Sequence, residues 1–256
     1  MNLLLAAAII LPVLSCEAPG GYHLRHKPEP AIVPSLPVTV EAISLPPGYE
    51  RMAAPAGSFT TWLRQVPLKK SNVVYLYNGS PKRNQNAQYA VLDISVGNQD
   101  LQQCADAVMR LRAEYLFAFQ QWDAIVFKDN ASRAYCYTGG NNRAAFDSYL
   151  RRVFGWCGTA SLEKQLTPVR RLNQLEAGDV LIKGGFPGHA VIVMDVAANR
   201  KGEKIYLLAQ SYMPAQDIHI LKNPMEPGAS PWYKVVDNQA VITPEWTFQP
   251  GQLRRW

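Results

Sequence analysis

The sequence predicts an α+β fold, in which amphipathic helices come first and a run of antiparallel strands follows. The chain has 256 residues, of which 48% are hydrophobic and 18% charged, so it carries enough apolar side chains for a sizeable core. Helical spacing dominates residues 100–166, whereas short apolar runs separated by turns dominate residues 178–210. Helices and antiparallel strands that are segregated along the chain are typical of α+β domains.

The first 15 residues are apolar and uncharged, and they end at Cys16. The apolar stretch 3–14 is too short to cross a membrane and suits the core of a signal peptide. The run Val13-Leu14-Ser15-Cys16 resembles the lipobox of bacterial lipoproteins, in which the cysteine is acylated and becomes the new N-terminus. A plain secretory signal that is cut nearby is the alternative. Both interpretations predict export, and the first predicts a lipoprotein anchored to the bacterial envelope membrane through Cys16.

A proline-rich segment follows this N-terminus. Seven prolines occur between residues 17 and 47, and proline favours extended chain and removes backbone donors. The segment is therefore predicted to be a semi-rigid tether. We expect three parts: a signal peptide over 1–15, the lipidated cysteine with its tether over 16–47, and a single α+β domain over 48–256.

The first half of the domain is predicted to contain two helices and two strands. The segment 58–66 predicts a short helix, and β-branched and aromatic content predicts strands at 73–77 and 90–96. Asp100-Leu-Gln-Gln matches a capping box that opens a helix to about residue 120. Residues at three- or four-residue steps define the buried face of that helix: Cys104, Val108, Leu111, Tyr115 and Phe119.

The second half is predicted to complete the helices and then to form the sheet. A strand at 125–127 precedes helices at 141–155 and 161–166. Three strands then follow, at 178–182, 189–196 and 204–210, with a turn at 199–202 between the last two.

Cys104 lies near the start of the predicted helix at 100–120. The N-terminus of a helix carries positive potential, which stabilises a thiolate and lowers the pKa of a cysteine below about 8.5. The alternative is a small apolar residue of the core. If Asp100 caps the helix, the N–H of Cys104 is used by the Asp100 carbonyl. If the helix begins at Gln102 or Gln103, this N–H is free to stabilise an oxyanion.

His189 opens an apolar strand directly after a glycine-rich turn, where backbone and ligand can approach closely. If the two following strands form a hairpin that sets Asp195 beside Lys204, His189 lies opposite Gln210. A polar side chain there would hydrogen-bond the imidazole and fix its tautomer. A slip of one residue would place Ser211 opposite instead. Gln210 is therefore the predicted orienting residue, and Ser211 is the alternative.

The order of these features resembles papain-like cell-wall hydrolases of the NlpC and CHAP type, over about 110 residues. A helix-borne cysteine is followed by AGDVLI, by PGHAVIVMD and by a polar residue on the next strand. In those folds a helix carrying the nucleophile packs on a small antiparallel sheet. The resemblance implies that Cys104 is the nucleophile, His189 the general base and then acid, and Gln210 the orienting residue. The chain departs from the family in having Gln103, and not Asp, directly before the cysteine.

Three longer motifs resemble an uncharacterised family of bacterial envelope domains, many of which are lipoproteins. They are DLQQCADAVMRLRAEYL, GGFPGHAVIVMD and LLAQSYMPAQDIHIL. This resemblance extends over nearly all of residues 48–256, and it implies an envelope location without implying an activity.

Two functions remain open. The first is a cysteine amidase or peptidase that acts on cell-envelope peptides, such as the stem peptides of peptidoglycan. The second is a non-catalytic surface lipoprotein that binds a glycan, a peptide or a partner protein on the same scaffold. Five aromatic residues are candidates for lining its cleft: Trp122, Tyr137, Trp156, Tyr212 and Trp232.

No metal or cofactor is expected, because Cys104, His189 and His219 match no known ligand spacing, and His219 is predicted to face solvent. Cys136 and Cys157 flank one helical segment and are candidates for a disulfide. The net charge of +6 fits an anionic envelope surface. Nucleic acid is not an expected partner, since no recognition motif or phosphate loop is present. The sequence does not indicate an oligomeric state.

Overall fold

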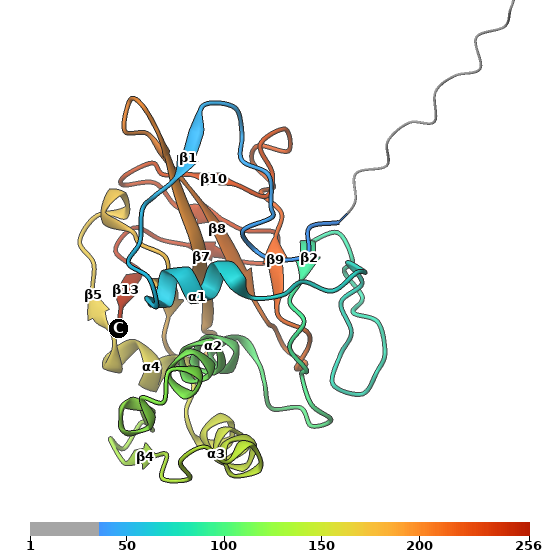
Figure 1. The fold of residues 1–256 in the computed structure, drawn as a ribbon, viewed down its shortest axis with the longest axis vertical. Helices are drawn as coiled ribbons and strands as arrows, with labels where there is room; N and C mark the ends of the chain where they lie inside the picture. The colour runs from blue at the N-terminus through green and yellow to red at the C-terminus, as the bar shows by residue number, and fades with distance from the viewer. Residues whose placement is uncertain (1–35) are drawn as a thin grey trace, which may run out of the picture. The chain divides into compact units, whose positions relative to one another are not determined.

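One antiparallel sheet forms the centre of the computed structural model, which describes residues 36–256 (Figure 1). Within these residues the sheet has nine strands, with the path β2-β9-β8-β7-β6-β13-β5; β1 pairs with β7 and β10 with β8. The strands are β1 (Tyr49–Arg51), β2 (Gln88–Val91), β5 (Thr167–Pro168), β6 (Val180–Lys183), β7 (His189–Asn199), β8 (Lys204–Gln210), β9 (His219–Leu221), β10 (Tyr233–Lys234) and β13 (Leu253–Arg255). The path brings the last strand of the chain beside β6.

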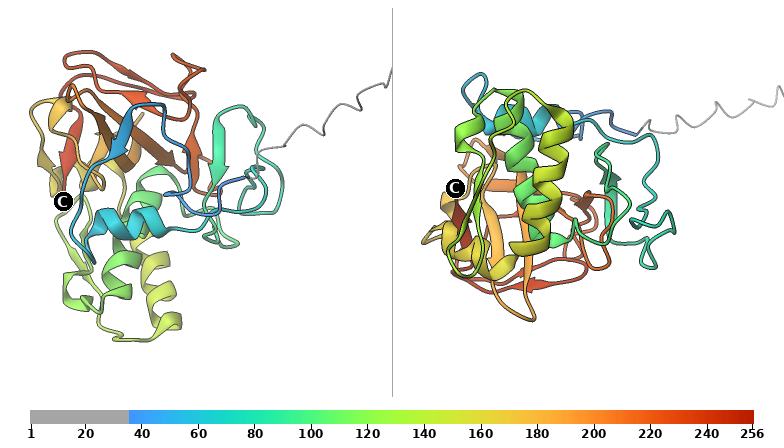
Figure 2. Two further views of the ribbon diagram at one scale, coloured as in Figure 1. Left: turned by 45° about the horizontal axis from the view of Figure 1, so that its top comes forward. Right: turned by 90° about the horizontal axis from the view of Figure 1, so that it is seen from below.

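Four α-helices occur in the described part of the chain: α1 (Phe59–Gln65), α2 (Cys104–Ala118), α3 (Arg143–Trp156) and α4 (Thr159–Gln165). Helices α1 and α2 contact β7, and α3 packs on α2 (Figure 2). Two 3-10 helices, η1 (Trp122–Ala124) and η2 (Leu172–Gln174), and two hairpins complete the fold. The hairpins are β3 (Val126–Lys128) with β4 (Ala134–Cys136), and β11 (Val241–Ile242) with β12 (Thr247–Phe248). Mixed helices and a large antiparallel sheet confirm the predicted α+β class.

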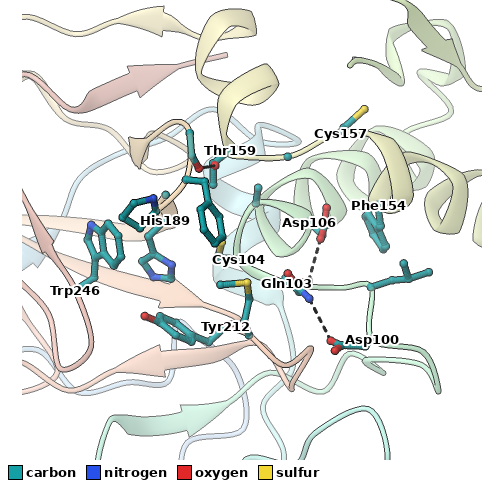
Figure 3. Close-up of a pocket in the computed structure, with 18 residues that line it drawn as sticks. Asp100, Gln103, Cys104, Asp106, Phe154, Cys157, Thr159, His189, Tyr212 and Trp246 are labelled. Carbon is teal, nitrogen blue, oxygen red and sulfur yellow. Dashed lines mark hydrogen bonds between the residues drawn. The ribbon is translucent and has the colours of Figure 1, made fainter. Parts of the chain in front are cut away.

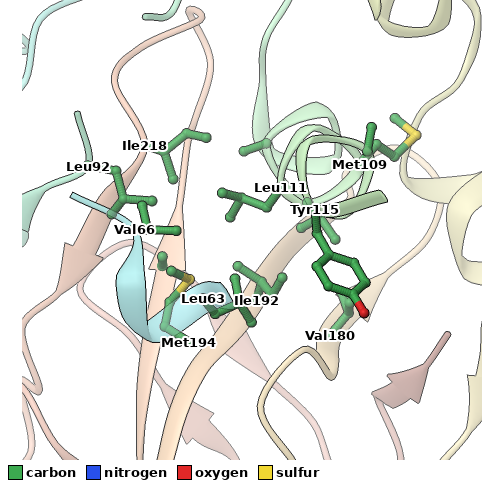
Figure 4. Close-up of a cluster of buried hydrophobic side chains, with 14 of the residues drawn as sticks. Leu63, Val66, Leu92, Met109, Leu111, Tyr115, Val180, Ile192, Met194 and Ile218 are labelled. Carbon is green, nitrogen blue, oxygen red and sulfur yellow. The ribbon is translucent and has the colours of Figure 1, made fainter. Parts of the chain in front are cut away.

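The central strand β7 is buried on both faces, which explains why its sequence is largely apolar. Ile192 and Met194 pack among side chains of α1 and α2 (Figure 4), while Val191 and Val193 pack in a second cluster on the other face. Four of the five residues predicted on the buried face of α2 are buried, and the fifth, Phe119, is exposed at the C-terminal end. The helical periodicity therefore identified the contact between α2 and the sheet.

Most predicted elements form, and their boundaries follow local caps. Helix α1 begins after Ser58, whose Oγ accepts the N–H of Thr61 at 3.3 Å. Helix α3 begins after Asn142, whose Oδ1 accepts the N–H of Ala145 at 3.0 Å. The strand predicted at 73–77 is wrong, because this segment makes only isolated bridges. The Tyr75 N–H is held by an Asp217 side chain and not by a neighbouring strand.

No helix within residues 36–256 combines the length and apolarity required to cross a membrane. The predicted signal peptide, most of the tether and Cys16 lie outside the described residues.

Candidate functional site

A pocket of about 410 Å³ lies where the N-terminus of α2 meets the start of β7 and the segment after β8 (Figure 3). Cys104 and His189 both line it, although they are 85 positions apart in the sequence. Gln210 lies behind His189, where only 1% of its surface is exposed. The fold therefore brings all three predicted site residues to one place.

Helix α2 begins at Cys104, with Gln103 as its N-cap. The Gln103 carbonyl accepts the N–H of Ala107 at 2.9 Å, and the Gln103 N–H donates to the Asp106 carboxylate at 3.0 Å. The predicted capping box at Asp100 is therefore wrong, because the local cap forms three residues later. As the first helical residue, Cys104 does not donate its N–H to a preceding carbonyl of the helix.

The thiol of Cys104 is buried beside several backbone donors. Burial raises its pKa to about 11, and the nearby charge of Asp106 adds to this effect. The N–H groups of Ala190, Ala105 and Cys104 itself act in the opposite direction. The helix N-terminus consequently does not produce the lowered thiol pKa that the sequence predicted, because only 7% of Cys104 is exposed and burial dominates.

The imidazole of His189 is held by Gln210: Nε2 of the histidine lies 2.8 Å from Oε1 of the amide. The predicted pairing register is wrong, since Ala198, and not Asp195, lies opposite Lys204. Near the site the pairing is displaced by two residues, with Ile192 opposite Ala209. A displacement by an even number keeps both side chains on one face of the sheet, so the contact forms diagonally.

Ser211, the alternative orienting residue, is used elsewhere. Its Oγ lies 2.9 Å from the Gln102 carbonyl and 2.8 Å from the Gln216 carbonyl. It thus connects the segment before α2 to the segment after β8. The structure places Gln210, and not Ser211, on the imidazole.

Three aromatic rings surround the imidazole of His189. The ring centroids of Tyr212, Trp246 and Phe248 lie 4.8, 5.3 and 5.9 Å from its own. Burial lowers the pKa of His189 to about 4, although the hydrogen bond that its ring donates to Gln210 opposes this. No hydrogen bond among the described residues joins His189 to Cys104. At neutral pH the site therefore holds a neutral thiol and a neutral imidazole.

Behind Gln210 lies a polar cluster that no local sequence pattern indicates. The Gln210 amide nitrogen donates to Glu245 at 2.7 Å, and Glu245 forms a 2.6 Å ion pair with Lys82. His219 also belongs to this cluster, and its predicted solvent exposure is wrong. It is fully buried because β9 lies between β8 and β2.

The glycine-rich turn before His189 packs closely on α4. A Cβ on Gly188 would collide with the Gly185 carbonyl and lie 2.6 Å from Oγ1 of Thr159. Thr159, the first residue of α4, in turn contacts the Gly185 carbonyl at 3.2 Å. Close packing of this turn on α4 fixes the point at which β7 begins.

The aromatic lining of the pocket differs from the prediction. Of the five candidates, only Tyr212 lines it. Tyr137 and Trp232 are in the core, and Trp156 is 64% exposed on α3. The other aromatic residues of the lining are Phe154, Phe186 and Trp246. Phe186 and Trp246 lie in loops and Phe154 lies on α3, and no local pattern indicates that these side chains meet.

The candidate disulfide between Cys136 and Cys157 is wrong, because both residues are free thiols. Cys136 is exposed on β4, whereas Cys157 is buried directly after α3 and lines the pocket. Burial raises the pKa of Cys157 to about 12. One thiol faces solvent and the other faces the interior.

Comparison with known proteins identifies a family but no activity. A model of the family described as "Domain of unknown function (4846)" matches residues 39–139 and 128–255. No curated protein and no solved structure matches the chain. The predicted resemblance to an uncharacterised domain is confirmed, while the resemblance to NlpC and CHAP hydrolases finds no support in these comparisons.

Proposed function

We propose that this chain, which belongs to the family described as "Domain of unknown function (4846)", is a cysteine hydrolase of cell-envelope peptides. One observation carries the proposal: Cys104 at the start of a helix and His189, held by Gln210, line a single pocket. A helix that bears the cysteine and packs on an antiparallel sheet bearing the other two residues supports a papain-like arrangement.

The hydrogen bond to Gln210 determines what His189 can do. An amide oxygen only accepts, so Nε2 of His189 carries the proton and Nδ1 keeps its lone pair. In the proposed reaction Nδ1 takes the thiol proton while Sγ of Cys104 bonds to the carbonyl carbon of an amide. The C–N bond then breaks, and the amine leaves with that proton. Water attacks the thioester, which releases the carboxylic acid and restores the thiol.

The start of α2 supplies a donor for the oxyanion that this attack creates. The N–H of Cys104 is free of the helix ladder and lies at the positive end of the helix dipole. Such pre-organised donors stabilise the tetrahedral intermediate in acyl transfer.

The lining of the pocket supports a peptide substrate. The chain has a net charge of +6, yet the described residues that line the pocket include the carboxylate of Asp100 and neither Lys nor Arg. The second carboxyl of the lining, Asp106, is buried, and burial raises its pKa well above the ordinary value. Aromatic side chains occupy much of the remaining wall. A peptide with apolar groups and an amine suits this lining better than a polyanionic ligand does.

The test is hydrolysis of purified peptidoglycan and of synthetic stem peptides, measured by the release of new amino groups. We expect Cys104→Ala to lose at least about 10³-fold in rate, because no other group supplies the nucleophile. Cys136→Ala is the matched control, since it removes an exposed thiol that does not line the pocket, and it should keep the wild-type rate. Equal release by wild type and Cys104→Ala would contradict the proposal.

One observation favours a second candidate, a non-catalytic peptide-binding protein. Cys104 and His189 are both buried, and neither is in its charged form at neutral pH. On this alternative the chain binds stem peptides without turnover, and Cys104→Ala binds them as tightly as wild type. Calorimetric titration of the peptides used in the hydrolysis assay separates the two functions.

We further propose that the protein is exported and held at the membrane by a lipid on Cys16, on the strength of the lipobox-like run before that residue. Expression of the full chain in bacteria fed a labelled fatty acid tests this. The wild type should carry the label and enter the membrane fraction, and Cys16→Ser should do neither. Label on Cys16→Ser would show that the anchor is elsewhere.

A further inference from the structure

The tautomer of His189 depends on which end of the Gln210 amide faces it. The amide oxygen accepts a hydrogen bond and so places the imidazole proton on Nε2, whereas the amide nitrogen would donate and require the proton on Nδ1. Only the first arrangement leaves Nδ1 free to act as the base. A neutral histidine next to a glutamine therefore needs something that determines the orientation of the amide.

Glu245 provides this constraint. Its Oε2 accepts the Gln210 amide nitrogen at 2.7 Å, and a carboxylate can only accept. The amide nitrogen must consequently point toward Glu245, which turns the amide oxygen toward His189 at 2.8 Å. Reversing the amide would set two oxygens against each other at the carboxylate.

His219 imposes the same orientation from another side. Its Nδ1 lies 2.9 Å from the Asp217 carbonyl, so Nδ1 carries the proton and Nε2 is left with a lone pair. This Nε2 faces the Gln210 amide nitrogen at 3.5 Å. Two acceptors, Glu245 and His219, thus surround the two hydrogens of the amide nitrogen.

Two further donors hold the Glu245 side chain in place. Lys82, which is itself buried, places its Nζ 2.6 Å from Oε2, and the Asn84 amide donates to Oε1 at 3.2 Å. A paired cation lowers the cost of an ionised carboxylate in a buried position. Contacts therefore run without a break from Lys82 to Glu245, from Glu245 to Gln210, and from Gln210 to His189.

We propose that Glu245 is a positioning residue of the site, which orients the Gln210 amide and so fixes the proton of His189 on Nε2. Its relevance to catalysis rests on the proposed hydrolase function. The tautomer itself is a property of the folded chain and can be measured without any substrate.

The experiment is nitrogen-15 NMR of the imidazole rings in the full chain. The protein has four histidines, so the His189 signals can be assigned by their loss in His189→Gln. In the wild type at neutral pH we expect the proton on Nε2 of His189. In Glu245→Gln the new amide can present either end to Gln210, and we expect the tautomer with the proton on Nδ1 to reach at least about a tenth of the population. Glu226→Gln, the same change in an exposed pair with Lys234, is the matched control and should leave His189 unchanged.

The steady-state constants add a second readout. Glu245→Gln should lower kcat for the peptide substrate by at least about a tenth, in proportion to the population protonated on Nδ1, with little change in KM, since it alters the base and not the pocket lining. Glu245→Asp keeps an acceptor-only group and should keep the proton on Nε2. An unchanged His189 tautomer in folded Glu245→Gln would overturn the inference. A wild type with the proton on Nδ1 would overturn it as well, even if no variant folds. Neither result depends on whether Cys104→Ala abolishes hydrolysis.

Discussion

Asp195→Ala should lower the free energy of unfolding by about 3–5 kcal/mol, the cost typical of breaking a buried ion pair. Asp195 is fully buried on β7, and each of its carboxylate oxygens accepts an Arg Nε at 2.7 Å, one from Arg51 and one from Arg64. The N–H of Val196 also donates to it, at 2.9 Å. Removing the carboxylate leaves two guanidinium groups without their counter-charge in a largely buried place.

This carboxylate also joins three elements that are distant in the sequence. Arg51 ends β1, Arg64 lies on α1, and Asp195 lies on β7. Both arginines bind backbone carbonyls as well, those of Ile43 and Met52, at 2.7 and 2.8 Å. The cluster therefore holds the N-terminal part of the domain on the central strand, and its loss should affect the whole cooperative unit.

Urea denaturation followed by circular dichroism measures the effect. Asp93→Ala, which removes an exposed carboxylate, is the control and should change the free energy of unfolding by no more than about 0.5 kcal/mol. A free energy of unfolding for Asp195→Ala within about 1 kcal/mol of the wild-type value would contradict the prediction. It would mean that water replaces the carboxylate at both arginines.

The elements with local signals were the ones that the sequence predicted well. Helices α1 and α3 carry a capping Ser58 or Asn142 and an apolar face, and both form close to their predicted bounds. Strand β8 forms over the predicted residues 204–210. Each helix shows helical periodicity directly after its cap, and β8 is a short apolar run after the turn at 199–202, so no distant contact is needed to recognise these elements.

Contacts between residues that are far apart in the chain could not be predicted from the sequence. The pairing of β13 with β6 joins residues that are more than 70 positions apart. The same holds for Glu245 and Lys82, which are 163 positions apart and meet behind Gln210. The residues around a glutamate in a loop do not indicate such a contact, because the contact depends on how the loop packs.

In the candidate site, some features were predicted from local signals and others were not. Cys104 and His189 were identified from their places at the start of a helix and a strand, and they do share a pocket. The Gln210 contact was predicted from a register that was wrong by two residues near the site, and only the two-residue period of a strand preserved the face. Of the two interpretations of Cys104, a thiol activated by the helix start and a buried core residue, the raised pKa fits the second, because burial outweighs the helix start.

Iodoacetamide should alkylate Cys104 roughly 100-fold more slowly at pH 7 than it alkylates an ordinary free cysteine. The pKa of the Cys104 thiol, about 11, lies well above the ordinary value of 9.0, and the thiolate is the species that reacts. Below that pKa, each unit of pH should raise the rate about tenfold until the thiol is ionised. Mass spectrometry of the alkylated peptides follows Cys104 separately from the exposed Cys136, which serves as the accessible reference in the same sample.

The pH at which the alkylation rate of Cys104 reaches half its maximum separates two forms of the site. If the thiol and imidazole are both neutral, this midpoint lies near 11 and is the same in His189→Ala, because no imidazolium stabilises the thiolate. If the site holds a thiolate–imidazolium pair, the midpoint falls below about 7 and rises in His189→Ala. The second result would contradict the neutral pair. The first would mean that His189 takes the thiol proton only when a bound substrate provides the electrophile, so that an unoccupied site resists alkylation and oxidation.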